Sequence, residues 1–163
     1  MTALTLEVGG LPIGLWLALA FVAVGFLFGV VGQAVSLIAW DKALDWNLQE
    51  DDPKSPDPMQ RGFFAVEWGL ALTDVVVQSI AVLMVLYGVL VQHWTGLLGG
   101  TVLFTIYVYY GLAYFARCWA IKLWRLGDWT RWRRVAVKFL IVAEPVGLIG
   151  LAGLWSNCRY FIG

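Results

Sequence analysis

The stretch FFAVEWGLALTDVVVQSIAVLMVLYGVLV, residues 63–91, decides the fold of this chain. It is longer than the ~20 apolar residues that an α-helix needs to cross a bilayer, and yet it contains the two acids Glu67 and Asp74. Residues 11–40, 97–121 and 135–155 form three further apolar stretches. The sequence therefore predicts an all-α membrane protein, an up-down bundle of four transmembrane helices that forms one domain over residues 1–163.

The composition agrees with this fold class. The chain is 61% hydrophobic and 13% charged, whereas a soluble domain averages about 25% charged residues. An ordinary soluble fold is thereby excluded, and the neutral net charge gives no support for binding nucleic acid. Only Glu7 is charged before the first stretch, and that stretch exceeds the ~7–15 apolar residues of a signal peptide. We therefore expect it to be a retained helix.

The positive residues predict how the chain is oriented. Four spans place both termini and the 92–96 turn on one side, and the loops 41–62 and 122–134 on the other. The two loops hold eight basic residues against Arg159 alone on the opposite side: Lys42, Lys54, Arg61, Lys122, Arg125, Arg131, Arg133 and Arg134. Positive loops stay cytoplasmic, so we expect both termini outside and, in a bacterium, the inner membrane. The acidic residues 50–58 could bind a hard cation, but a solvated loop is the favoured interpretation.

Polar residues fall on one face of each of two central helices. Glu67, Asp74 and Gln78 are separated by seven and four residues, which places them on one helical face. In residues 97–121 a stripe of similar spacing contains Tyr107, Tyr110, Tyr114 and Arg117. The two stripes predict a ligand or ion site between the helices. A structural stripe with bonded tyrosine hydroxyls is the alternative.

Depth in the membrane predicts a specific ion pair. Glu67 and Arg117 each lie about four residues from the cytoplasmic end of their helices, which is some 6 Å at 1.5 Å per residue. Because a paired Arg and Glu satisfy each other's charge, we expect these two to meet. Lys138 is equally shallow, and we expect it to extend to the headgroups.

Two further acids lie near the middle of their spans. Asp74 and Glu144 have no basic residue at their depth, so we expect them to be largely protonated, because desolvation and mutual repulsion disfavour the charged form. Pro145 removes a backbone hydrogen bond beside Glu144. This combination fits a proton or cation site. It equally fits a protonated acid that bonds the freed carbonyl.

Small residues repeat along three of the helices. They are Gly25, Gly29, Gly32 and Ser36 beside Gln33, then Gly96 and Gly100, then Gly147, Gly150 and Gly153. Such spacings let helices approach closely in lipid. They serve either packing within the chain or contact with another subunit, and we expect a homo-oligomer or other membrane subunits as partners besides the lipid bilayer.

The remaining composition narrows the function. The single histidine, His93, cannot build a haem or zinc site alone, and Cys118 and Cys158 lie near opposite ends of the bundle. We therefore expect no metal and no cofactor. The predicted function is proton- or ion-linked transport through Glu67, Asp74, Gln78, Tyr110, Tyr114, Arg117 and Glu144. The alternatives are an accessory subunit of a larger membrane complex, or an enzyme that acts on a lipid or isoprenoid by acid–base chemistry.

Overall fold

The computed structural model of this chain describes residues 7–46, 48–49, 51–123 and 129–162. Within the last range it describes only the backbone of residues 129–132, 135, 138 and 139. The predicted position of the Lys138 side chain therefore lies outside the described residues. Nearly all of the described chain is helical.

A short hairpin precedes the first helix. Strands β1 (Glu7–Val8) and β2 (Leu11–Pro12) pair antiparallel. Gly9 and Gly10 form the turn between them with φ of 59° and 79°. This left-handed backbone carries no steric penalty in glycine, and a two-residue turn with two positive φ angles suits the twist of a hairpin.

The first membrane helix is continuous over Ile13–Ile38 but changes its winding on the way. It begins as α1 (Ile13–Gly25), widens into the π-helical segment η1 (Phe26–Val31) and continues as α2 (Gly32–Ile38). The N–H of Gly32 bonds to the carbonyl of Leu27, five residues back. The helix ends at Ala39, where φ is −144° and ψ is 66°, and the short helix α3 (Trp40–Asp45) turns away.

The second and third long helices are joined by a two-residue turn. Helix α4 (Pro58–Val91) is capped by the Asp57 carboxylate, which accepts a hydrogen bond from the N–H of Met59 at 2.9 Å. Pro58 stands at its start, where a missing N–H costs nothing. The helix ends at Gln92 with a left-handed φ of 52°, and α5 (Trp94–Leu123) follows.

Helix α6 (Trp129–Ser156) and the single turn α7 (Arg159–Ile162) complete the chain. Three helices of the described chain are long and apolar enough to cross a membrane, namely Ile13–Ile38, Pro58–Val91 and Trp94–Leu123. In α6 the apolar part is confined to Leu140–Ser156 and is shorter. Three predicted spans therefore have the length and composition that a crossing requires, and the fourth is present as a helix.

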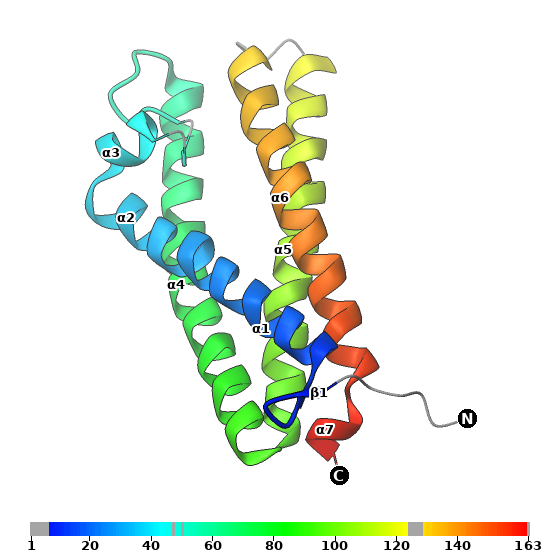
Figure 1. The fold of residues 1–163 in the computed structure, drawn as a ribbon. Coiled ribbons are helices and arrows are strands. Elements are labelled where there is room, and N and C mark those ends of the chain that lie inside the picture. Colours follow the sequence, from blue (N-terminus) through cyan, green and yellow to red (C-terminus); the bar gives the residue numbers. More distant parts are fainter. Residues whose placement is uncertain (1–6, 47, 50, 124–128, 163) are drawn as a thin grey trace.

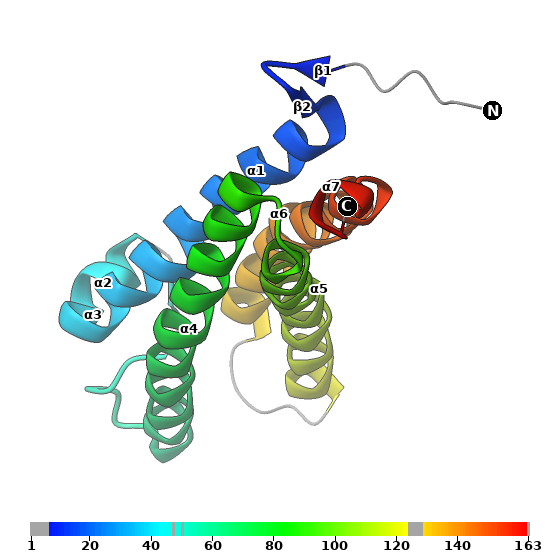
Figure 2. The same ribbon diagram turned by 90° about the horizontal axis from the view of Figure 1, so that it is seen from below.

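The four long helices do not run as an aligned bundle. Helix α5 packs against both α4 and α6, whereas α1 packs on α6 and the continuation through η1 and α2 packs on α4. The first helix thus crosses the layer of the other three obliquely (Figures 1 and 2). The predicted up-down four-helix bundle is not confirmed. The hairpin, the α4–α5 turn and α7 lie at one end of the molecule, and α3 lies toward the other (Figure 1).

Most glycines of the repeating motifs are used inside the chain. Gly88 and Gly96 bring the backbones of α4 and α5 together. A side chain on Gly150 of α6 would collide with the Phe104 ring, and one on Gly25 would collide with Tyr107. These glycines allow the close packing of the core between α1, α4, α5 and α6. Their pattern therefore no longer argues for an oligomer, and the oligomer itself stays a prediction.

Candidate functional site

The polar stripe of α4 faces the tyrosine stripe of α5, as predicted. Three contacts join them in order along the helices: Tyr114 Oη to Glu67 Oε2 at 3.0 Å, Tyr110 Oη to Asp74 Oδ1 at 2.9 Å, and Tyr107 Oη to Gln78 Oε1 at 2.9 Å. Glu67, Asp74 and Gln78 are all buried. Because each of the three meets a hydroxyl, the stripes form a continuous polar seam between two helices of membrane-spanning length.

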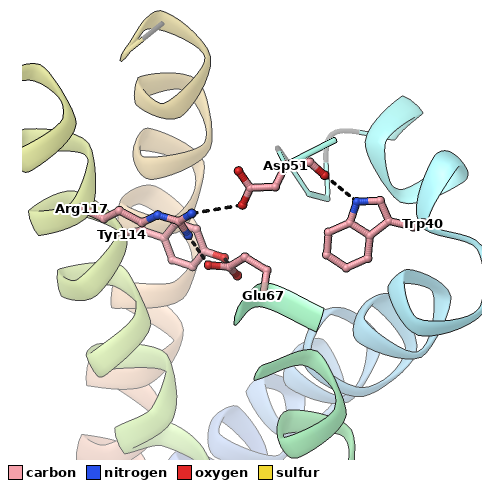
Figure 3. Close-up of polar contacts among 5 residues, drawn as sticks. All are labelled: Trp40, Asp51, Glu67, Tyr114 and Arg117. Atoms are coloured by element: carbon pink, nitrogen blue, oxygen red, sulfur yellow. Dashed lines mark hydrogen bonds and ion pairs between the residues drawn. The ribbon is translucent and has the colours of Figure 1, made fainter. Parts of the chain in front are cut away.

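The predicted ion pair lies at one end of this seam and is confirmed. The Arg117 guanidinium bonds to Glu67 Oε1, and its second terminal nitrogen lies 3.1 Å from Asp51 Oδ2 (Figure 3). The same guanidinium stacks over the Phe63 ring, 4.6 Å from its centroid. One cation of α5 thus holds an acid of α4 and an acid of the preceding loop.

Asp51 corrects the expectation of a solvated acidic loop. Only 1% of this residue is exposed, although it lies among charged and proline residues that favour solvent. Burial is possible because Arg117 supplies a counter-charge, and a buried carboxylate is tolerated only when it is paired. The indole N–H of Trp40 donates to the Asp51 backbone carbonyl at 2.7 Å and fixes the loop from the other side (Figure 3).

The loop also contacts the first helix through Gln49. Its amide nitrogen lies 3.1 Å from both Gln33 Oε1 and Ser36 Oγ on α2. Gln49 therefore contacts α2, whereas Asp51 contacts α5 through Arg117.

Gln49 also lines a cavity of about 290 Å³. Its walls come from the first helix, the loop, α4, α5 and α6, and they are mostly apolar and aromatic. The polar side chains that line it are Gln33, Ser36, Gln49, Asp74, Gln78 and the tyrosines 107, 110 and 114. Asp74 is the only carboxylic acid among these lining residues. A largely apolar cavity with a few convergent polar groups is the usual form of a small-molecule site.

The π-helical segment shapes one wall of this cavity. Gly29 lies in η1, and a side chain there would collide with Gln78 and the Tyr107 hydroxyl. The same hydroxyl lies 2.7 Å from the Gly25 carbonyl, to which it donates. The Tyr107 hydroxyl therefore has two acceptors within reach, the Gly25 carbonyl and Gln78 Oε1, and it links the first helix to α4. π-helical turns frequently occur at functional sites.

Glu144 does not join this group. Its carboxyl packs against Gly111 of α5, and it does not line the cavity. Its Oε1 is buried and has no hydrogen-bond partner among the described residues. The structure thus brings Glu67, Asp74, Gln78, Tyr110, Tyr114 and Arg117 onto one seam and leaves Glu144 apart.

Sequence reasoning missed Asp51, Gln49 and Trp40, which belong to the loop and its flank. No helical period marks a loop residue, so only the chain's folding back onto the helices reveals them. Gln33 and Ser36 had been noticed, but only as members of the small-residue face. Among the described residues no cluster of three or more His, Cys, Asp and Glu side chains could hold a metal ion, and Cys118 and Cys158 are free.

The chain matches no protein-family model, no curated protein and no solved structure. Its function therefore has to be argued from the site itself.

Proposed function

We propose that this chain is a small integral membrane protein that binds a small amphipathic molecule in its cavity and carries it across the bilayer in a proton- or ion-linked cycle. The observation that supports this most directly is Asp74, a buried acid that lines the cavity and belongs to a helix of membrane-spanning length. Ionisable side chains inside membrane segments mark the pathways of substrates, ions and protons.

The residues of the seam take different parts in this proposal. Asp74, hydrogen-bonded to Tyr110, is the group that exchanges a proton or cation. Gln78 and Tyr114 line the cavity and orient the bound molecule. Arg117, paired with Glu67 and Asp51, holds the loop whose residues Leu48 and Gln49 line the cavity. Glu144 stays a prediction as a site residue.

The proposal includes four spans with both termini outside and the loops 41–62 and 122–134 in the cytoplasm of a bacterium. Helix α6 has 28 residues. In the proposed orientation its N-terminal part lies at the cytoplasmic interface, where its basic residues are favoured. Four helices make a thin wall around a pathway, so a homo-oligomer or a partner subunit is also part of the proposal. Native mass in nanodiscs tests this last point.

Binding to the cavity is tested with three probes of one shape class. They are benzyltrimethylammonium, its uncharged carbon isostere neopentylbenzene, and the anion phenylacetate, each added to the protein in nanodiscs. Gly32 lines the cavity, and a Cβ there would meet only the Leu27 carbonyl at 3.7 Å. Gly32→Leu therefore has room to fill the cavity. Gly69→Leu is its matched control, because Gly69 is exposed on α4 with nothing nearby.

We expect at least one probe to bind the wild type and the Gly69→Leu control, and to lose binding in Gly32→Leu. Counterflow of that probe in proteoliposomes then tests transport, which Asp74→Asn should abolish. The proposed site would be overturned if none of the three probes binds. It would also be overturned if the probes bind Gly32→Leu as tightly as the wild type. Cavity binding without counterflow would leave a receptor or an enzyme instead of a carrier.

A further inference from the structure

We infer that the cavity takes a small lipophilic ammonium ion, with its positive nitrogen at Asp74. This inference rests on the proposed cavity function and names its ligand class. Two independent features of the cavity support it: the charge of its lining and its aromatic content.

The lining carries one acid and no base. Asp74 is 6% exposed, and neither Lys nor Arg is among the residues that line the cavity. Arg117, the basic residue at the end of the seam, is bonded to Glu67 and Asp51. A charge inside a membrane protein needs a partner of opposite sign. A cationic ligand satisfies the Asp74 carboxylate, whereas an anionic ligand meets repulsion.

Aromatic rings line the same cavity as the acid. Tyr107, Tyr110 and Tyr114 line the cavity on α5, and Phe28 and Trp46 line it from the first helix and the loop. The Tyr110 and Tyr114 rings are 6.2 Å apart between centroids. Aromatic faces attract cations, and this attraction strengthens when water is excluded. A carboxylate among aromatic rings is a surrounding that stabilises an ammonium ion and offers less to an uncharged molecule.

Apolar residues make up much of the rest of the lining, among them Val24, Leu48, Val142 and Val146. The apolar remainder of the cavity suits the hydrocarbon part of the same ligand.

The three probes test this inference on the wild-type protein. Benzyltrimethylammonium should bind about tenfold or more tightly than neopentylbenzene, because only the cation gains the ion contact with the Asp74 carboxylate and the attraction of the aromatic faces. Phenylacetate should bind least. Asp74→Asn should remove the preference for the cation and leave the binding of the isostere unchanged. Because the comparison between probes needs no variant, it stands even where Asp74→Asn fails to fold.

Tyrosine variants provide the matched control. Tyr110→Phe removes the hydroxyl that bonds Asp74 and should weaken binding of the cation severalfold. Tyr109→Phe changes an exposed neighbour that does not line the cavity and should change nothing. Equal or tighter binding of the isostere or the anion, still lost in Gly32→Leu, would overturn the ammonium inference and leave the cavity proposal standing. If no probe loses binding in Gly32→Leu, both the ammonium inference and the cavity proposal would be overturned.

Discussion

Arg117 is the residue on which three segments of the chain depend. Its guanidinium reaches Glu67 on α4 and Asp51 in the loop, and both acids are buried. A buried pair contributes little net stability when it is replaced as a whole, but the loss of one partner strands the other. Each of these three charges therefore relies on the others, because the loss of one leaves a buried charge without its partner.

Removing Glu67 and Arg117 together should therefore cost less than the sum of the two single changes. Glu67→Gln should lower the thermal stability in detergent by an amount on the order of 3–5 kcal/mol, and Arg117→Met added to it should recover part of that loss. The recovery is partial because Asp51 loses its counter-charge. Arg159→Met serves as the control, since Arg159 is exposed and should add independently. Strict additivity of the Glu67 and Arg117 changes would contradict the pairing.

Glu144 should behave in the opposite way. Its buried Oε1 has no hydrogen bond among the described residues, and replacing an unsatisfied polar group by an apolar one of similar shape is often neutral or stabilising. Glu144→Met should leave the free energy of unfolding unchanged or raise it by up to about 1–3 kcal/mol. The melting temperature, which reports this change, should stay the same or rise. A loss as large as that expected for Glu67→Gln would show that Glu144 has a partner in the folded protein. Lost counterflow in Glu144→Gln would return it to the site.

At the scale of elements, the π-helical segment η1 contains Gly29 and is followed directly by Gly32, and these two glycines have opposite surroundings. A side chain on Gly29 collides with Gln78 and Tyr107, whereas one on Gly32 meets only a carbonyl at 3.7 Å. Alanine is otherwise the better helix former by about 1 kcal/mol. An alanine at Gly29 therefore tests mainly packing, whereas an alanine at Gly32 tests mainly helix propensity, within the same helix.

Gly29→Ala should destabilise the protein by about 1–3 kcal/mol, as overpacking does, and should weaken ligand binding because it displaces Gln78. Gly32→Ala should be neutral or slightly stabilising. Thermal unfolding in detergent and binding of benzyltrimethylammonium measure the two effects. Equal stability of the two variants would mean that η1 does not pack against α4 and α5 in this way.

The helices themselves could be predicted because lipid selects on length and composition. Residues 63–91 were expected from their apolar length, and the structure extends the helix to Pro58 because Asp57 and Pro58 form its start. The π-helical widening could not be predicted, since Phe26–Val31 has no feature that separates it from an α-helix. Neither could the oblique crossing of the first helix, because each helix satisfies its own hydrogen bonds and packing alone sets the angle.

The site was predictable where it follows a helical period. The spacing of Glu67, Asp74 and Gln78 and that of the tyrosines placed both stripes on facing surfaces, and the contacts agree. Asp51 and Gln49 follow no period, and their burial depends on a loop that folds back onto the helices. Glu144 was grouped with Asp74 by depth alone. Depth does not say which way a helix turns a side chain, and α6 turns this one toward Gly111.

At the scale of the whole molecule, charge is distributed unevenly between the two ends. The loops 41–62 and 122–134 hold eight basic residues, and the opposite side holds Arg159. The hairpin, the α4–α5 turn and α7 lie together at one end (Figure 1), as that division requires. Positive loops are retained in the cytoplasm.

A reporter fused after Gly163 should accordingly indicate an external terminus, and one inserted near Ser55 should indicate cytoplasm. Paired reporters, one active only outside and one only inside, measure both positions. Reversing the charge balance, by adding lysines after Gly163 and neutralising Arg131, Arg133 and Arg134, should weaken this preference. A cytoplasmic C-terminus in the unaltered chain would contradict either the four spans or their polarity.

The position of Arg117 along the chain also constrains how the protein is made. Asp51 and Glu67 leave the ribosome before Arg117 does, so α4 enters the translocon with an acid whose counter-charge has not yet been synthesised. An unpaired acid in lipid is costly, and the two-residue turn at Gln92 and His93 keeps α5 directly behind α4. We therefore expect the two helices to partition into a bilayer as one unit, and the loop that carries Asp51 to settle only after Arg117 is in place.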